Sequence, residues 1–306
     1  MISASPLLTI ATRPSQLARW QADFVAEALS AHHSNLDVRI KVITTRGDKT
    51  LDQPLPEIGG KGIFTQELEA ELLGGGVDLA VHSLKDLPVD DPPGLCLGAI
   101  LQREDPRDVL ISRSGASLAD LAAGSVVGTS SPRREAQVRA LRPDLQIMPI
   151  RGNVETRIRK VTDGEYDAAV MAAAGVIRLG LEQHVREYFS LDQILPAPGQ
   201  GALAVQVRCE DKRVLTLLDP IESESIRHPV QAERFFLAGL GGGCSAPVGA
   251  FAEVHDGAIH LTGFVGSLEG TQVIRVHAEG EDPEELGMRL ANQALGQGAH
   301  ELIADA

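Results

Sequence analysis

Short apolar runs alternate with helical patterns over the first two-thirds of this 306-residue chain, and this alternation constrains the fold most strongly. Runs typical of buried strands occupy residues 7–11, 38–44, 78–82, 125–128, 145–150 and 167–172. Helical patterns cover residues 64–73 and 132–141 and begin again near residue 154. Ser15 is placed to cap a further helix, whose apolar stripe would be Leu17, Trp20, Phe24 and Ala28. Such β-α-β alternation predicts mostly parallel, doubly wound sheets.

The pattern changes in the last third of the chain. Residues 193–201 are punctuated by proline and glycine like a hinge, and a strand at 202–207 could return to the first sheet. A small antiparallel α+β domain is predicted from about residue 221. Its expected elements are a helix at 229–238, strands at 251–254, 259–264 and 273–277, and a closing helix at 283–295. A chain of 306 residues exceeds the usual size of one hydrophobic core, so two or three domains are expected.

Composition argues against several classes of function. Aromatic residues make up only 3% of the chain, which disfavours base-stacking platforms for single-stranded nucleic acid. A formal net charge of −14 opposes binding to DNA and to anionic membranes, because both carry the same sign. No apolar run approaches the roughly 20 residues needed to cross a bilayer, and no signal peptide is evident. We therefore expect a soluble, cytoplasmic protein.

The three cysteines do not form a recognisable framework. Because none has CxxC spacing, neither disulfides nor a metal site is expected, and a reducing compartment is indicated. Cys96 and Cys209 lie in apolar, strand-like runs and are interpreted as packing residues. Cys244 lies in the glycine-rich run GLGGGCSAP, where an electrophile could reach the thiol. Taken alone, such a cysteine is more often a small residue tolerated in a turn.

Arginines follow predicted strands at their carboxyl ends. In GTSSPRR at residues 128–134, Ser131 and Pro132 are suited to begin a helix, so Arg133 and Arg134 fall in its first turn. Cations there oppose the helix dipole, and their placement makes sense if an anion lies between them. The alternative is two solvated arginines.

Similar arrangements recur elsewhere in the chain. Arg151 and Arg157 flank a predicted cap at Asn153, and Arg13 lies between a predicted strand and Ser15. Ligands of open α/β sheets bind at the carboxyl ends of strands, so these elements could face one cleft. Arginine suits planar, bidentate recognition of carboxylates or phosphates.

Lys85 and Asp86 also follow a predicted strand. The carboxylate of Asp86 could be satisfied by salt bridges, or it could stabilise a cation formed from the substrate. Charges about 4 Å apart at an effective dielectric constant near 20 interact by about 4 kcal/mol. Made only in the transition state, that interaction would be worth about a thousandfold in rate.

Nine short motifs occur in an informative order. They are ATR (11–13), TRGD (45–48), GGKG (59–62), VHSLKDLP (81–88), REDPRD (103–108), GTSSPRR (128–134), RGN (151–153), PGQG (198–201) and GGGC (241–244). The chain resembles the hydroxymethylbilane synthase (porphobilinogen deaminase) family in these motifs, from about residue 7 to 303. It departs at Leu84, where methionine is frequent, and after the cysteine, where residues bulkier than Ser245, Ala246 and Pro247 are common.

The resemblance implies an α/β fold with two doubly wound lobes, like those of periplasmic solute receptors, and a small α+β C-terminal domain. The corresponding domains are residues 1–101 with 202–219, residues 102–201, and residues 220–306. The implied reaction condenses four porphobilinogens head to tail into linear hydroxymethylbilane, with release of ammonia, in tetrapyrrole biosynthesis. A dipyrromethane cofactor, bound to Cys244 through a thioether, would prime the chain. The resemblance also implies a monomer and hand-over of product to uroporphyrinogen-III synthase.

Roles for particular residues are implied in the same way. Asp86 would stabilise the azafulvenium left by ammonia loss and the protonated pyrrole formed on coupling. The acetate and propionate groups of the ligands would be clamped by Arg13, Arg133, Arg134, Arg151 and Arg157. Further contacts would come from Ser15, Lys61, Lys85, Thr129, Ser130, Ser131 and Arg178.

Three other functions fit the residues less well. A two-lobed receptor that binds an anionic solute without catalysis would share the arginines, but it predicts an export signal and no use for Cys244. A cysteine hydrolase would need a base beside the thiol, and the nearest histidines in sequence, His228 and His255, lie in no recognisable motif. A phosphate-transfer enzyme would need a P-loop, and GGKG lacks its spacing and the following Ser or Thr.

Overall fold

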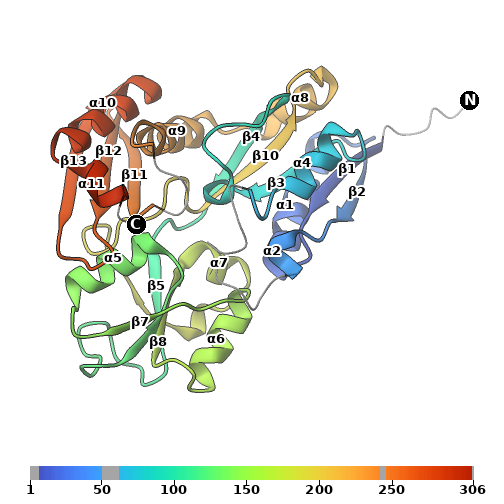
Figure 1. Ribbon diagram of the computed structural model, residues 1–306. Helices are drawn as coiled ribbons and strands as arrows, with labels where there is room; N and C mark the ends of the chain where they lie inside the picture. Colours follow the sequence, from blue (N-terminus) through green and yellow to red (C-terminus); the bar gives the residue numbers. More distant parts are fainter. Residues whose placement is uncertain (1–6, 50–61, 242–245, 305–306) are drawn as a thin grey trace, which may run out of the picture. The chain divides into compact units, whose positions relative to one another are not determined.

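The fold is seen in a computed structural model, which describes residues 7–49, 62–241 and 246–304 (Figure 1). The chain divides into two compact units. Unit 1 consists of Met1–Gln102 and Ala202–Ile226, and unit 2 of Arg103–Gly201 and Arg227–Ala306. No helix among the described residues is long and apolar enough to cross a membrane.

Unit 1 is built on a five-stranded sheet with the order β2-β1-β3-β10-β4. Its strands are β1 (Leu7–Thr12), β2 (Asp37–Val42), β3 (Leu79–Ser83), β4 (Leu95–Arg103) and β10 (Ala202–Arg208). Strand β1 runs parallel to β2 and β3, and β10 lies antiparallel to β3. The predicted return of the chain to the first sheet is therefore confirmed.

Helices cover both faces of this sheet. Helix α1 (Gln16–His32) begins at the predicted cap, where the side chain of Ser15 accepts a hydrogen bond from the backbone N–H of Ala18. It packs on the face that carries Leu8, Ile10, Leu79 and Val81. Helix α4 (Gln66–Leu73) packs on the opposite face, against Ala11 and Ala80. Shorter helices of this unit are α2 (Arg46–Lys49), η1 (Leu84–Asp86), α8 (Lys212–Leu218) and η3 (Asp219–Ile221).

The predicted apolar stripe of α1 is wrong by one position. The residues buried against the sheet are Ala18, Ala22, Val25 and Leu29, together with Gln21. Trp20 and Phe24 are only partly buried and stack on each other with ring centroids 5.4 Å apart. The small alanines let the helix approach the sheet closely, so the bulky aromatic rings lie at the margin of the contact.

Unit 2 contains a second five-stranded sheet, with the order β7-β6-β8-β5-β9. The strands are β5 (Asp108–Ser112), β6 (Val126–Gly128), β7 (Gln146–Met148), β8 (Ala168–Ala172) and β9 (Val185–Tyr188). Strand β6 is parallel to β7 and β8, and β5 is antiparallel to β8. The helices are α5 (Pro132–Leu141), α6 (Val154–Thr162), α7 (Ala173–Arg178) and η2 (Glu182–His184). Strand β8 continues directly into α7.

Both five-stranded sheets share one plan, with three neighbouring parallel strands followed by an antiparallel fourth. In unit 2, Val138 of α5 packs on one face with Val170, and Ile158 of α6 packs on the other with Met171. Helices on both faces make each lobe doubly wound. The predicted α/β fold class is therefore confirmed.

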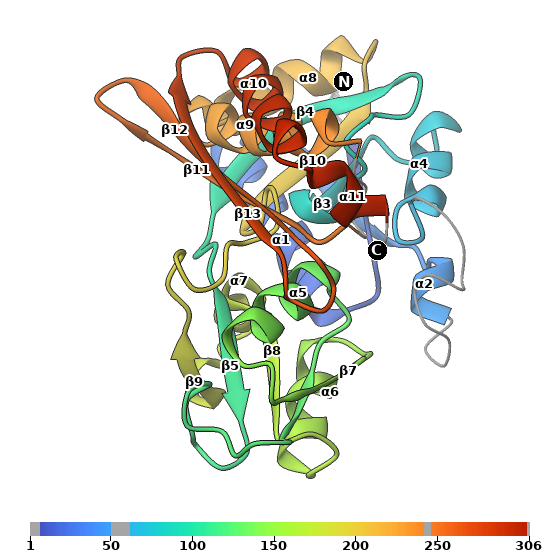
Figure 2. The ribbon, with the colours of Figure 1, turned by 60° about the vertical axis from the view of Figure 1, so that its left-hand side comes forward.

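The remainder of unit 2 is the predicted α+β part. Strands β11 (Val248–His255), β12 (Ala258–Gly266) and β13 (Val273–Gly280) form an antiparallel sheet, accompanied by α9 (Glu224–Gly239), α10 (Pro283–Gly296) and α11 (Ala299–Ala304). Figures 1 and 2 show α5 at one end of this sheet, where Ala136, Leu195 and Phe264 form a small apolar cluster. A division of unit 2 into residues 102–201 and 220–306 stays a prediction.

Most of the segment predicted as a hinge is buried within unit 2, although Gln193 at its start is exposed. Gln200 is fully buried, and its side chain donates hydrogen bonds to Pro106 O at 2.7 Å and to Asp108 Oδ1 at 2.9 Å. Glu233 of α9, also fully buried, accepts from Gly199 N at 2.7 Å and from both terminal nitrogens of Arg103 at 2.7 and 3.2 Å. These side-chain hydrogen bonds satisfy backbone groups that regular secondary structure would otherwise pair. The segment can therefore be buried although its prolines and glycines form no helix or strand.

Candidate active site

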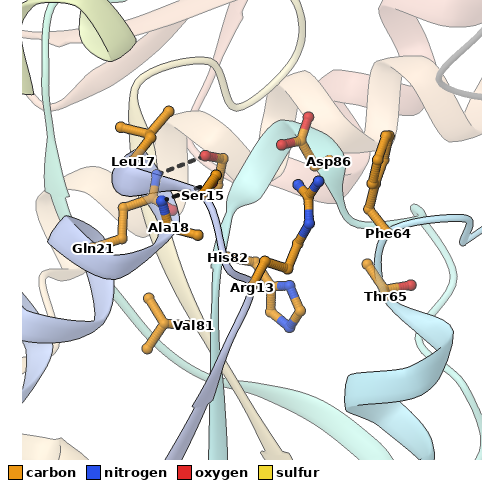
Figure 3. A pocket seen from close by; sticks show the side chains of 11 residues that line it. Arg13, Ser15, Leu17, Ala18, Gln21, Phe64, Thr65, Val81, His82 and Asp86 are labelled. Carbon is orange, nitrogen blue, oxygen red and sulfur yellow. Dashed lines mark hydrogen bonds between the residues drawn. The ribbon is translucent and has the colours of Figure 1, made fainter. Parts of the chain in front are cut away.

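A pocket of unit 1 lies where β1 and β3 end, as expected for a parallel sheet. Arg13 and Ser15 follow β1, and Asp86 lies in the short η1 helix directly after β3. Figure 3 shows Arg13 and Asp86 turned toward one another, with Phe64 to one side and His82 below. The structure thus brings together three of the predicted site residues of this unit, and Lys85, half-buried, stands next to Asp86.

The guanidinium of Arg13 is held by protein groups. Its Nη2 and Nε donate hydrogen bonds to the carboxylate of Asp48, at 2.5 and 3.3 Å, and it lies 4.1 Å from the centre of the Phe64 ring. Because one edge of the guanidinium is occupied, Arg13 offers a ligand its remaining donor edge.

Asp86, unlike Arg13, is not held by an oppositely charged side chain of the described residues. Its side chain is exposed, and no ion pair within 4.0 Å joins it to a cation in the part of the chain that the structure describes. The alternative in which Asp86 is satisfied by a salt bridge to an arginine is therefore wrong for these residues. Asp86 lines the pocket.

Sequence reasoning missed further polar residues that line the pocket, among them His82 and Gln21. His82 is 5% exposed, and burial first, then the charge of Arg13, lowers the pKa of its ring from 6.5 to about 4, although Gln206 beside it acts in the other direction. The ring is therefore neutral near pH 7. Gln21 donates to Ser83 Oγ at 2.7 Å. The sequence does contain a feature that could have indicated His82, because this histidine interrupts an apolar strand directly before Ser83.

In unit 2, the loop after β6 carries three of the predicted hydroxyls. Thr129 Oγ1 accepts from Ser131 N at 3.2 Å, and Ser131 caps α5. Ser130 Oγ donates to Ile150 O at 2.9 Å and accepts from Ile150 N at 3.0 Å, which ties the loop to the end of β7. These hydroxyls thus order the backbone around the arginines; their predicted contact with a ligand stays a prediction.

Arg133 and Arg134 point into unit 2. Asp108 is fully buried and accepts from Arg133 Nη1 at 2.7 Å and from Nε and Nη2 of Arg134 at 3.1 and 2.8 Å. The alternative of two solvated arginines is therefore wrong. Burial alone would raise the pKa of Asp108, but the charges of the two arginines outweigh it and hold that pKa far below its usual value. The anion predicted between the arginines is thus a protein carboxylate. The triad of Asp108, Arg133 and Arg134 carries one more positive than negative charge.

The remaining predicted site arginines of unit 2 are Arg151, Arg157 and Arg178. Arg151 follows β7 and is half-buried, and burial lowers the pKa of its guanidinium. Arg157 Nε donates to Gly152 O at 2.8 Å. Arg178 is 7% exposed and donates to Gly201 O at 2.7 Å; burial lowers its pKa to about 10 against the opposing charge of Glu104.

Some predicted features lie beyond these observations. Lys61 and Cys244 fall outside the described residues. Cys209 is exposed, so its interpretation as a packing residue is wrong, whereas Cys96 is half-buried. Across residues 7–49, 62–241 and 246–304, no group of three or more His, Cys, Asp or Glu is arranged to hold a metal ion.

Comparison with known proteins identifies the family. Residues 8–216 match the family model "Porphobilinogen deaminase, dipyromethane cofactor binding domain", and residues 228–296 match "Porphobilinogen deaminase, C-terminal domain". The chain belongs to the porphobilinogen deaminase family. A curated porphobilinogen deaminase from Syntrophomonas wolfei subsp. wolfei is 49% identical over 300 residues, which covers 97% of this chain and 98% of that relative.

Solved structures also resemble this porphobilinogen deaminase family member in part. The BenM effector binding domain with its effector benzoate is 16% identical, with a TM-score of 0.44, over 72% of this chain and 91% of that one. The periplasmic VFT2 domain of Bordetella pertussis BvgS is 15% identical, with a TM-score of 0.40, over 70% of this chain and 86% of that one.

The residues present fit the cofactor named for the family. A dipyrromethane carries two carboxylates on each pyrrole ring and is therefore strongly anionic. Unit 2 holds Arg133 and Arg134 against the single carboxylate of Asp108, with Arg151 half-buried nearby in sequence. Guanidinium groups in surroundings that exclude water attract carboxylates more strongly than solvated ones.

Proposed function

We propose that this protein is a porphobilinogen deaminase that joins four porphobilinogens head to tail into hydroxymethylbilane and releases ammonia. The observation that supports this most directly is the unit 1 pocket. There Asp86 carries a charge without a paired cation among the described residues, while the neighbouring Arg13 is engaged by Asp48. An anion in that state suits a reaction that creates positive charge on its substrate.

The role of Asp86 follows from the bond that breaks. Porphobilinogen loses ammonia when the carbon–nitrogen bond of its aminomethyl ammonium group breaks and the electron pair leaves with nitrogen. The methylene carbon and the pyrrole ring then share a positive charge. Asp86 stabilises this charge, and at about 4 Å the interaction is worth about 4 kcal/mol at an effective dielectric constant near 20.

The arginines bind and orient the anionic side chains of the substrate. Arg13 does so in unit 1 through its free edge, and Arg151 and Arg157 do so in unit 2, with Ser15, Lys61, Lys85 and Arg178 as further contacts. Arg133 and Arg134 supply the surplus charge of their triad with Asp108. When bound to Cys244, the dipyrromethane supplies the pyrrole carbon on which the chain grows.

Intact mass spectrometry tests the attachment. Purified wild-type protein should be heavier than its sequence mass by one dipyrromethane, and Cys244→Ser should lack a stable adduct. Cys209→Ser is the matched control, because Cys209 is exposed and lies outside the pocket. A native, active protein of unmodified mass, or a Cys244→Ser variant that carries the adduct, would refute the attachment.

Turnover of Asp86→Asn tests the chemistry. This variant should keep the fold, because Asp86 is exposed, and lose nearly all turnover. Near-normal turnover would rule out the cation role. A receptor that only binds an anionic solute would show neither turnover nor adduct. The finer expectations are a cytoplasmic monomer that hands its product to uroporphyrinogen-III synthase, which gel filtration and a coupled assay with that enzyme would test.

A further inference from the structure

Two opposite charges line the unit 1 pocket without pairing. Arg13 and Asp86 face one another (Figure 3), but the ion pair of Arg13 within 4.0 Å is with Asp48. An arginine next to an exposed carboxylate would normally pair with it, which would neutralise the anion. Something in the fold therefore prevents that pairing.

Asp48 is itself anchored. Its Oδ2 accepts hydrogen bonds from the backbone N–H and the hydroxyl of Thr45, at 3.0 and 2.8 Å. The same carboxylate binds Arg13 through both oxygens, and its side chain is only 12% exposed. A carboxylate fixed from two directions holds a guanidinium in one orientation, because moving it would break several charge-assisted hydrogen bonds.

Phe64 supports Arg13 from a second side. The ring stacks on the guanidinium at 4.1 Å. It reaches this position because residue 47 is a glycine: a Cβ added to Gly47 would lie 2.1 Å from Phe64 Cε1. The turn at residues 45–48 thus supplies Asp48 and leaves space for Phe64.

Electrostatics keep this arrangement in place near pH 7. Burial alone would raise the pKa of Asp48, but the hydrogen bond and charge of Arg13, with the two bonds from Thr45, lower it overall, so Asp48 stays ionised. His82 is neutral. Among the described residues, the charge of Arg13 is therefore balanced by Asp48, whereas no ion pair balances that of Asp86.

We infer that Asp48 is a positioning residue, which holds Arg13 off Asp86 and so leaves Asp86 as the unbalanced negative charge of the pocket. This inference rests on the proposed role of Asp86 for its effect on turnover, but its structural part is independent of that role.

Asp48→Asn tests the inference, with Asp78→Asn as matched control. Asp78 is also a partly buried aspartate of unit 1 that pairs with arginines, Arg208 and Arg213, and it lies outside the pocket. We expect Asp48→Asn to lower kcat by about tenfold or more, because Arg13 then pairs with Asp86. Asp78→Asn should keep the wild-type kcat. Equal kcat for Asp48→Asn and wild type would overturn the inference.

An NMR measurement separates this inference from the proposed function. The side-chain carboxyl carbon-13 signal of Asp86, assigned with Asp86→Asn, reports on this group alone. In Asp48→Asn we expect this signal to move from its wild-type position, because Arg13 then lies next to the Asp86 carboxylate. An unchanged signal would refute the inference. If instead the signal moves while Asp86→Asn keeps full turnover, the positioning stands and the cation role fails.

A double variant completes the test. If Asp48 acts only through Arg13, then Arg13→Gln with Asp48→Asn should be no slower than Arg13→Gln alone. Additive losses in kcat would show that Asp48 acts independently of Arg13 and would contradict the inference.

Discussion

Acid should destabilise unit 1 through His82. Burial and the charge of Arg13 lower the pKa of this ring from 6.5 to about 4 in the folded protein. Below pH 6.5 the His82 ring is therefore protonated in the unfolded chain but still neutral in the folded chain. The free energy of unfolding falls with pH until the pH reaches the pKa of the folded state. At about pH 5 the loss relative to neutral pH is about 2 kcal/mol.

Urea unfolding of wild type and His82→Leu at neutral pH and near pH 5 measures this quantity. The carboxylates with lowered pKa values, such as Asp48 and Asp108, lose their stabilising effect only as the pH falls below their usual value of 3.8. They therefore leave this window unaffected. Wild type should lose about 2 kcal/mol more than His82→Leu between the two conditions. An equal loss in both proteins would refute the reasoning.

Three further predictions concern unit 2. Asp108→Asn leaves Arg133 and Arg134 buried without their carboxylate, so urea unfolding should show a loss of about 3–5 kcal/mol; a loss below about 1 kcal/mol would show that the triad is unimportant for stability. Gly201→Ala should cost about 2 kcal/mol or more, because Gly201 has φ of +91° and a Cβ there would lie 2.3 Å from the carbonyl oxygen of Glu104; an unchanged Tm would contradict this. Arg151→Leu should block cofactor assembly or chain extension, seen by intact mass as missing adducts, and normal chain growth would count against a carboxylate clamp.

The sequence predicts local features of the fold well. Helix α5 runs over Pro132–Leu141 as expected, because Ser131 and Pro132 fix its start through their own backbone geometry. The sequence does not predict features that depend on residues far away along the chain. The stripe of α1 depends on the sheet it meets, and the 193–201 segment is buried because Glu233 and Arg103 supply hydrogen bonds from elsewhere in the chain.

The candidate site shows the same division. The dipole argument predicted an anion at the start of α5, and an anion is there, but it belongs to Asp108, which lies 25 residues before Arg133. Conversely, nothing local to Asp48 says that its carboxylate meets Arg13, 35 residues away. Charge balance can be read from a sequence, whereas the identity of each counter-ion depends on how the strands are ordered.

The insertion of β10 between β3 and β4 has a consequence for synthesis of the chain. When about the first hundred residues have left the ribosome, β3 and β4 have been made but β10, which lies between them in the sheet, has not. Strand β4 finds its sheet neighbour only after Ala202–Arg208 has been translated. The sheet of unit 1 is therefore completed only after the five-stranded sheet of unit 2 has been translated. A fragment that stops at residue 102 would expose an open edge on β3.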